Sequence, residues 1–474
     1  MVCDDQGVII ASVHAERPPE NRLCSAAKQN RCNPMRITAL DAYPIFDSRG
    51  NPTVEAIITL DSGDTGRGIV PSGASTGQYE ALELRDKNPA LFRGKSVFKA
   101  IENIQSEIAP MLMRRHVTEQ GEIDQAMCEL DGTENKSRLG ANAILAVSMA
   151  VASAAAASRD EQLFEYLAAR LGEPGVLLPL PEIQIFGGGA HAQHRIDLQD
   201  FMIICTGATS YAQVMEMTFN IYHAARDIMH ERGKLHGLAD EGGFWPDFKG
   251  NEDVFETLLE AIVRAGYEPG KDVAISLDIA ASDLYEAGRY HFKSEGRVFS
   301  CDEFAKLMIQ WCEKYPIISI EDPMADVDWD GWKQVHAALG DRVQLIGDDL
   351  FTTNLERIEQ GIARGVANSV LIKLNQIGTV SETIAAIQRT QEAGWLPVVS
   401  ARSGETEDAF IAHLAVATNA GQLKVGSFAR SERMVKWNEI IRIERALGDR
   451  AVFEGSAIYH RILRHPRVSL LNPK

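Results

Sequence analysis

Short apolar segments, each ending at a polar residue, recur at a regular spacing in the C-terminal part of this 474-residue chain. The segments are too short for helices and alternate with helical stretches, which is typical of parallel strands covered on both faces. In chain order, the polar residues at or within the segment ends are Asp278, Glu321, Asp348, Lys373, Ser400 and Lys424. They are separated by 43, 27, 25, 27 and 24 residues, and most of these intervals fit one strand, one helix and two short loops. The spacing favours a (β/α) barrel over an open doubly wound sheet.

The acids of this series are candidate metal ligands. The C-terminal strand ends of a barrel meet at one mouth, where Asp278, Glu321 and Asp348 would repel one another unless a cation neutralised them. Carboxylate oxygens with no Cys or His at the same spacing favour Mg²⁺ over Zn²⁺. Each acid taken alone could instead cap a helix or bind a loop, but three in succession at the barrel period favour the metal.

The lysines of the series permit two interpretations. Lys373 follows an apolar segment, and both burial and a neighbouring dication lower the pKa of a lysine. Such a lysine can act as a base that takes a proton from a carbon next to a carboxylate. A structural ion pair with one of the acids is the alternative for Lys373, and Lys424 has the same ambiguity.

Two further motifs suit an anionic substrate. Arg402 and Ser403 follow the segment that ends at Ser400, and a guanidinium beside a hydroxyl suits a phosphate or a carboxylate. Glu241 precedes two glycines that allow close approach of a substrate, so it is a candidate general acid. The glycine-rich segment 187–191 lacks the spacing of a dinucleotide or Walker loop, and we predict no nucleotide binding.

The N-terminal part has a different pattern. Strand-like residues from Ile37 to about Leu60 are interrupted by a turn-rich segment at 47–52. A sequence pattern typical of helices follows the Gly/Ser-rich loop 71–77. This order predicts an α+β domain over residues 35–172, followed by the barrel domain over residues 173–474. Residues 1–34 lack a clean periodicity and are interpreted as a disordered tail, or as an artefact if translation starts at Met35.

Composition excludes several classes of protein. With 66 acidic and 48 basic side chains the formal charge is −18, which argues against a nucleic-acid binder or an anionic-membrane binder. The seven cysteines form an odd set without CxxC spacing, which favours a reducing cytoplasm over a disulfide framework. No segment is expected to provide the roughly 18 consecutive apolar residues of a membrane helix, so we predict a soluble cytoplasmic protein.

From Met35 to about Leu447 the chain resembles the enolase (phosphopyruvate hydratase) family. The segments that carry the resemblance are Asp47-Ser-Arg-Gly-Asn-Pro-Thr-Val-Glu55, Pro71-Ser-Gly-Ala-Ser-Thr-Gly77, Leu139-Gly-Ala-Asn-Ala-Ile-Leu145, Asp240-Glu-Gly-Gly243, Ser319-Ile-Glu-Asp322, Gly347-Asp-Asp349, Asn375-Gln-Ile-Gly378, Arg402-Ser-Gly-Glu-Thr-Glu-Asp408 and Arg430-Ser-Glu-Arg433. The resemblance implies an N-terminal α+β domain and an eight-stranded α/β barrel whose first strands depart from simple alternation. It also implies a Mg²⁺-dependent hydro-lyase with two ions, which forms phosphoenolpyruvate from 2-phosphoglycerate, and a homodimer or higher homo-oligomer.

The resemblance also assigns roles to individual residues. It implies that Lys373 is the base and Glu241 the acid that helps the hydroxide leave. Lys424 is similar to the lysine on the substrate carboxylate, and Arg402 with Ser403 to the phosphate contacts. The ligands implied for the first metal ion are Asp278, Glu321 and Asp348, and the ligand implied for the second is Ser75. The other implied substrate-pocket positions are His191, Gln199 and Asp200.

Four residues depart from the usual pattern of the family. Ala401 stands where a histidine is usual, Asp200 where most members have glutamate, Gly187 where asparagine or serine is common, and Ala239 where glycine is common. All four are expected around the substrate rather than at the first metal or the base. The alternative hypothesis is therefore a paralogue that dehydrates a phosphonate analogue, as in carboxyphosphonoenolpyruvate formation. A third hypothesis is a catalytically silent binding protein.

Overall fold

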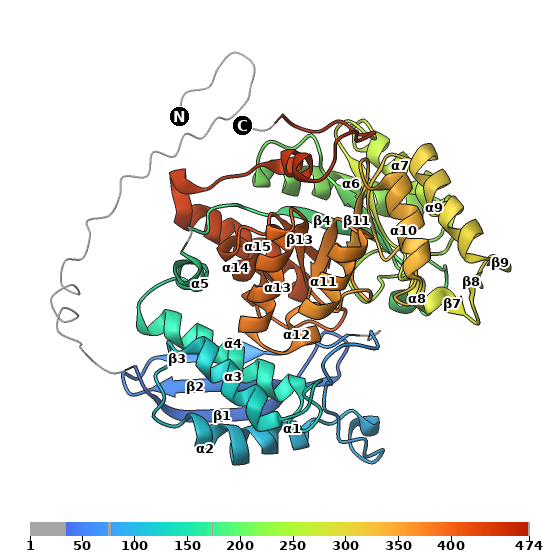
Figure 1. Ribbon diagram of the computed structural model, residues 1–474. Helices are drawn as coiled ribbons and strands as arrows, with labels where there is room; N and C mark the ends of the chain where they lie inside the picture. The colour runs from blue at the N-terminus through green and yellow to red at the C-terminus, as the bar shows by residue number, and fades with distance from the viewer. Residues whose placement is uncertain (1–34, 74–76, 173, 473–474) are drawn as a thin grey trace. The chain divides into compact units, whose positions relative to one another are not determined.

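The computed structural model describes residues 35–73, 77–172 and 174–472. The predicted tail 1–34 and the predicted metal ligand Ser75 lie outside the described residues. The first elements form an antiparallel sheet in the order β1-β2-β3, with bounds Ile37–Phe46, Pro52–Leu60 and Thr65–Ile69 (Figure 1). The α-helices that follow are α1 (Phe98–Asn103), α2 (Ala109–Leu112), α3 (Gln120–Asp131), α4 (Ala141–Ser158) and α5 (Leu163–Leu171).

The turn-rich segment between β1 and β2 closes the predicted hairpin. The Asp47 carboxylate accepts the backbone N–H groups of Arg49 at 2.9 Å and Asn51 at 2.8 Å. An Asp side chain that hydrogen-bonds to the backbone two residues on stabilises a turn without the help of a strand. The turn therefore holds Arg49 in a defined position at the end of the sheet.

Helix α4 is the core of this N-terminal unit and packs against β2 and β3. Its 18 residues are apolar enough on average to cross a membrane by length and composition, although they contain no run of 18 consecutive apolar residues. Its alanines and its Ile, Leu, Val and Met side chains keep the mean hydropathy high, while Asn142, Ser148 and Ser153 interrupt the apolar sequence. However, 83% of the helix is buried inside the protein, and a helix that is apolar all round is typical of a buried core.

The C-terminal part closes into a barrel with the strand order β10-β11-β12-β13-β14-β4-β5-β6. In chain order the strands are β4 (Leu180–Gly187), β5 (Asp200–Ile204), β6 (Ala274–Asp278), β10 (Ile317–Glu321), β11 (Gln344–Gly347), β12 (Ser369–Ile372), β13 (Leu396–Ser400) and β14 (Gln422–Ser427). Strand β5 pairs antiparallel with both β4 and β6, while the other pairs are parallel. The predicted α/β fold class, with its irregular first strands, is confirmed.

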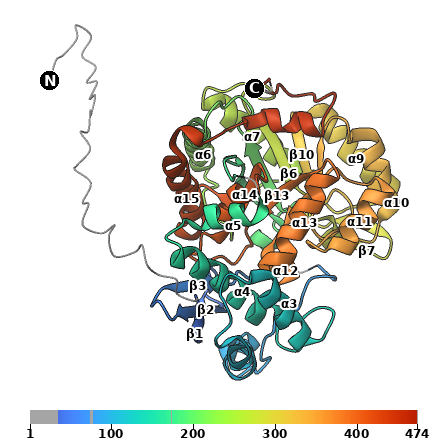
Figure 2. The ribbon, with the colours of Figure 1, turned by 60° about the vertical axis from the view of Figure 1, so that its left-hand side comes forward.

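Helices cover the outside of the barrel (Figures 1 and 2). Those of ten or more residues are α6 (Tyr211–Glu231), α7 (Asn251–Arg264), α9 (Cys301–Lys314), α10 (Trp329–Leu339), α11 (Leu355–Arg364), α13 (Val380–Glu392) and α15 (Ser431–Leu447). The shorter helices of the barrel are α8 (Ala281–Leu284), α12 (Leu374–Ile377) and α14 (Phe410–Ala417), and a small separate sheet contains β7 (Tyr285–Glu286), β8 (Arg289–Phe292) and β9 (Arg297–Phe299). Helix α12 directly follows β12 and packs against α4, so the N-terminal unit contacts the barrel next to a strand end.

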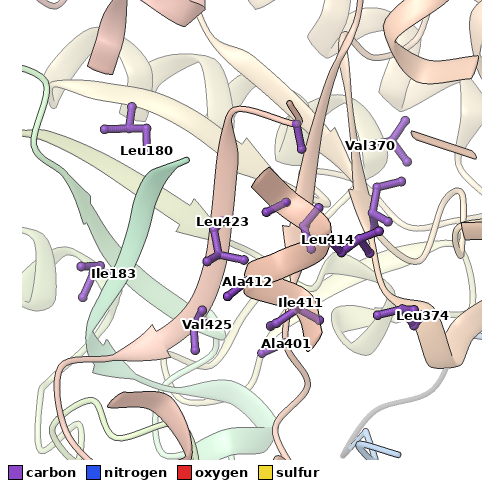
Figure 3. Packing of buried hydrophobic residues seen from close by; sticks show 14 of the residues in the cluster. Leu180, Ile183, Val370, Leu374, Ala401, Ile411, Ala412, Leu414, Leu423 and Val425 are labelled. Atoms are coloured by element: carbon purple, nitrogen blue, oxygen red, sulfur yellow. The ribbon is translucent and has the colours of Figure 1, made fainter. Parts of the chain in front are cut away.

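Side-chain alternation along β14 directs a charged group into the barrel. Leu423 and Val425 belong to the hydrophobic core that includes Ile411 and Ala412 of α14, which packs outside β14 (Figure 3). Successive side chains of a strand point to opposite faces, so Lys424 faces the barrel interior.

A buried polar network fills the interior behind the mouth. The Glu182 carboxylate of β4 accepts hydrogen bonds from Ser276 Oγ at 3.0 Å and Gln422 Nε2 at 3.1 Å. Gln344 donates to Gln422 at 2.7 Å, which links β11 with β14 across strands that are not neighbours. These side chains are fully buried, so the network contains an acid that has no access to water. Burial raises the pKa of Glu182 to about 7, although Lys424 and Ser276 act in the opposite direction.

The first prediction concerns the close approach of β3 to α4. A Cβ atom on Gly68 would lie 2.4 Å from the Ala146 carbonyl oxygen and 2.7 Å from the Ala150 amide nitrogen, which are backbone atoms that cannot rotate away. We therefore expect Gly68→Ala to lower the free energy of unfolding by about 1–3 kcal/mol or more, measured by urea unfolding. Gly121→Ala is the control, because Gly121 lies in α3 with open space around it and should gain up to about 1 kcal/mol. Equal stability of the two variants would contradict this account of the packing.

The second prediction concerns the pH dependence of stability. Since the pKa of Glu182 rises from 4.5 to about 7 on folding, the folded protein keeps a proton that the unfolded chain releases over this range. The stability from this proton is complete below pH 4.5 and is lost as the pH rises through 7. Glu182→Gln removes the effect, so the variant should gain about 2–3 kcal/mol relative to the wild type between about pH 5 and about pH 8. Urea unfolding at both pH values checks this, and parallel stability curves for the two proteins would contradict it.

Candidate active site

The barrel brings the predicted strand-end residues together at one mouth. Asp278 and Glu321 are the last residues of β6 and β10, Asp348 follows β11, Lys373 follows β12, and Lys424 lies within β14. The cavity at this mouth is lined by Glu80, His191, Gln199, Glu241, Asp278, Asp348, Asp349, Lys373, Ser400, Ala401, Arg402, Ser403, Lys424 and Val425. Of the predicted site residues that the structure describes, Asp200 and Glu321 lie behind this lining.

Lys424 is the central cation of the mouth. Its Nζ atom lies 2.6 Å from Glu321 Oε2, 2.9 Å from Asp278 Oδ2 and 3.4 Å from Asp200 Oδ2. All four side chains are buried, so the ion pairs are shielded from water. Burial acts to lower the pKa of Lys424, but the surrounding carboxylates outweigh it and raise the pKa well above its ordinary value. Lys424 is therefore a permanent positive charge at the base of the cavity.

Lys373 forms the second ion pair, 2.5 Å from Asp348 Oδ2. Burial acts to lower its pKa, but the Asp348 carboxylate outweighs burial and raises it. The expected lowering of the Lys373 pKa is therefore not found in the protein alone. The ion pair with an acid, which was the alternative interpretation of Lys373, is present instead. Asp348 also accepts a hydrogen bond from Gln376 at 2.8 Å, which fixes its second oxygen.

Arg402 and Ser403 connect the mouth with the N-terminal unit. The buried Arg402 guanidinium lies 2.9 Å from Glu80 and 3.1 Å from the Asn375 side-chain oxygen. Arg49 from the β1–β2 turn donates to Ser403 Oγ at 3.3 Å and to the Ser72 carbonyl at 2.9 Å. Ser72 in turn pairs with Gly404 through backbone hydrogen bonds. The site is therefore completed by residues that lie far before the barrel in the chain.

A second group of polar side chains forms another part of the cavity wall. His191 Nδ1 is 3.2 Å from Asp200 Oδ1, and His191 Nε2 is 3.7 Å from Glu241 Oε1. Burial acts to lower the His191 pKa, but Glu241 and Asp200 outweigh it and raise the pKa. Gln199 donates to Asp278 at 3.1 Å and so links this wall with the acid cluster. The predicted general acid Glu241 therefore lies beside a histidine whose protonated form the neighbouring acids favour.

The three acids predicted to bind metal are close but do not form the tightest group. Within the described residues, the sets whose ligand atoms lie within 4.8 Å of one another are His191, Asp200 and Glu241, and Asp322, Asp348 and Asp349. Lys424 lies between Asp278 and Glu321, which explains why these two carboxylates do not converge further.

The acid cluster nevertheless has the chemistry of a divalent cation site. Glu321 Oε1 is buried without a hydrogen-bond partner among the described residues. Burial, followed by the charge of Asp278, raises the Glu321 pKa well above its ordinary value, and burial with the charge of Asp348 raises the Asp349 pKa to about 8. The positive charges of the protein do not fully balance these carboxylates. Hard oxygen donors in such a cluster suit Mg²⁺.

Sequence reasoning missed several residues of the site. Asp322 accepts the backbone N–H groups of Asp348 at 2.9 Å and Asp349 at 2.8 Å, and so holds the metal-candidate loop in place. Asp349 and Asp322 each directly follow a predicted ligand, and adjacency to a strand end was a signal that could have identified them. Glu80 and Arg49 had no such signal, because their approach to the barrel depends on domain packing.

The residues that depart from the family pattern have different environments. Ala401 lines the cavity next to Arg402. Gly187 and Ala239 face each other, because a Cβ atom on Gly187 would lie 2.6 Å from the Ala239 Cβ. The glycine therefore makes room for the alanine, and the two residues fit each other in packing.

Comparison with known proteins gives one consistent family. Residues 37–167 match the N-terminal domain of enolase, and residues 175–462 match the C-terminal TIM barrel domain of enolase. Over 427 residues the chain is 52% identical to Enolase 1 of Desulfitobacterium hafniense (strain Y51). The matched region covers 90% of this chain and 97% of that protein. The matched domains, the identity and the strand-end residues of the barrel together show that the chain belongs to the enolase family.

Proposed function

We propose that the protein is a Mg²⁺-dependent hydro-lyase that converts 2-phosphoglycerate to phosphoenolpyruvate. The observation that carries this proposal is the gathering of three cations, the buried Lys424 and Arg402 and the partly buried Lys373, around one cavity of an enolase family member. A small acid with a carboxylate and a phosphate needs several fixed positive charges to bind. The carboxylates beside these charges suit a Mg²⁺ ion.

The chain's own residues divide the work of binding. Lys424 attracts the substrate carboxylate, and its fixed charge favours the second negative charge that develops there when the C2 proton leaves. Arg402 and Ser403 hold the phosphate, since a guanidinium can bind two phosphate oxygens at once. His191 and Gln199 line the cavity and shape the substrate end.

Proton transfer falls to two residues. Lys373 accepts the C2 proton in its neutral form. The ion pair with Asp348 favours the protonated form, and a metal ion held by Asp348 would weaken that pair. Glu241 gives a proton to the C3 hydroxyl as it leaves as water. Mg²⁺ held by Asp278, Glu321 and Asp348, with Ser75 proposed as a ligand of a second ion, would supply charge that stabilises the enediolate form of the substrate carboxylate.

The alternative functions have less support. The phosphonate hypothesis depended on a cluster of substitutions at the substrate, but Gly187 and Ala239 compensate for each other in packing. Asp200 keeps contact with His191, which leaves Ala401 as the substitution that directly faces the cavity. The 52% identity to an enolase also favours 2-phosphoglycerate over a phosphonate, and it favours an active enzyme over a silent binding protein.

The other expectations complete the proposal. We propose that residues 35–172 form a capping domain for the barrel domain 173–474, and that the protein is a cytoplasmic homodimer or higher homo-oligomer. Glu80 and Arg49 support the capping role, because they reach Arg402 and Ser403.

The third prediction tests turnover and the base. Initial rates of enol formation, followed by ultraviolet absorbance with Mg²⁺, should be efficient with 2-phosphoglycerate and lower with its phosphonate analogue. Lys373→Ala should lower kcat by about 10²–10⁴-fold or more, because the proton acceptor is lost. Lys136→Ala is a matched control, since the buried Lys136 is also paired with an acid, 3.0 Å from Glu382, but lies outside the cavity lining. A folded wild-type protein that forms no phosphoenolpyruvate, or an active Lys373→Ala variant, would refute the proposal.

The fourth prediction tests the metal site without turnover. Mg²⁺ at about 100 times its Kd should stabilise the folded wild type by about 2.7 kcal/mol, seen as a rise of the thermal unfolding midpoint. Glu321→Gln should weaken this rise, because it removes a charged ligand, whereas Glu182→Gln alters a buried acid of the same barrel away from the cavity lining and should keep it. An equal Mg²⁺ response of Glu321→Gln and the wild type would rule out Glu321 as a ligand.

A further inference from the structure

Behind the cavity wall, the side chain of Gln184 joins two parts of the site. Gln184 lies on β4 and is fully buried. Its Oε1 atom accepts the backbone N–H of Gly243 at 2.8 Å, and its Nε2 atom donates to Asp200 Oδ1. Neither the strand-end pattern nor the family resemblance assigned a role to this residue.

The amide has one consistent orientation. A backbone N–H needs an acceptor and a carboxylate needs a donor, so the oxygen of Gln184 faces Gly243 and the nitrogen faces Asp200. A carboxylate at this position would oppose the Asp200 charge. An apolar side chain would leave the Gly243 N–H without its acceptor and would remove one donor from Asp200, which would keep His191. The site therefore requires an amide of this length.

The space around Gln184 is equally restricted. A Cβ atom on Gly243 would lie 2.4 Å from Gln184 Oε1, and one on Gly187 would lie 3.3 Å from Gln184 Nε2. The segment from Ala239 to Gly243 is closed by a backbone hydrogen bond of 2.7 Å, and Glu241 lies within it. Gln184 thus connects the loop that bears Glu241 with the acid that contacts His191.

These contacts form a chain that ends at the reacting groups. Asp200 Oδ1 accepts a hydrogen bond from Gln184 Nε2 and lies 3.2 Å from His191 Nδ1. The other ring nitrogen of His191 faces Glu241. Asp200 Oδ2 has no hydrogen-bond partner among the described residues and lies 3.4 Å from Lys424. A rotation of the Asp200 carboxylate would therefore disturb both the histidine and the central cation.

We propose that Gln184 is a positioning residue that orients Asp200, and through it His191, for the acid step at Glu241. This inference rests on the proposed function, since the acid step belongs to the dehydration. Gln184 itself lies outside the cavity lining, so its effect on the reaction is transmitted by Asp200.

A double-mutant cycle tests the contact. Gln184→Asn withdraws the amide by one methylene, and Asp200→Glu extends the carboxylate by one, so the double variant restores the reach between the two groups. We expect Gln184→Asn to lower kcat by about 10–100-fold, with little change in KM, because a slightly misplaced acid affects the transition state. Adding Asp200→Glu should raise the kcat of Gln184→Asn by about tenfold or more. Such coupling would show that the two side chains act through their contact.

The control and the contrary outcomes are specific. Gln422→Asn shortens another fully buried barrel glutamine, which binds Glu182 rather than Asp200, and should keep the wild-type kcat. If Gln184 only supported the Gly243 N–H, the double variant would show no recovery, and the proposal would be overturned.

Crystal structures of the variants separate this inference from the proposed function. Asp200 and His191 should be displaced in Gln184→Asn and return in the double variant, whether or not the wild type turns over 2-phosphoglycerate. Unmoved Asp200 and His191 side chains in Gln184→Asn would overturn the inference. Failure of the wild type to form phosphoenolpyruvate would overturn the proposed function alone.

Discussion

The neutralisation of buried acids by Lys424 is the interaction on which the mouth of the barrel depends. Closure of the barrel brings Asp200, Asp278 and Glu321 from three strands to within 3.4 Å of one ammonium group. Without that charge, three buried carboxylates would repel one another at a large desolvation cost. The apolar neighbours of Lys424 on β14 pack outward against a helix, and this packing is what points its ammonium group inward.

The site is shared between the two parts of the chain. The barrel supplies Arg402 and Ser403, while the N-terminal unit supplies Glu80 and Arg49 to hold them. The contacts of Ser72 with Gly404 fasten the loop region to the same barrel segment. A substrate phosphate at Arg402 would compete with Glu80 for the guanidinium, so substrate binding and the position of the N-terminal loops are physically coupled.

Substitutions in a functional site gain their meaning from their neighbours. Along the chain, Gly187, Asp200 and Ala239 suggest a reshaped substrate end. In the structure, the missing side chain of Gly187 accommodates Ala239, and the carboxylate of Asp200 is held by Gln184 and His191. Gly187 and Ala239 thus fit together in packing and Asp200 has hydrogen-bonded partners, while Ala401 is part of the cavity lining itself.

The spacing of the short apolar segments already favoured the barrel and identified its strand-end residues, because such segments leave few ways to bury their faces. Each polar residue that ends a strand, such as Asp348 or Lys373, must then lie at the mouth. Which of these groups are in contact became known only from the folded chain. It placed Lys424 between two of the acids and brought Glu80 to Arg402 across 322 positions. Such contacts depend on side-chain reach and on the packing of distant segments, and a linear pattern contains neither quantity.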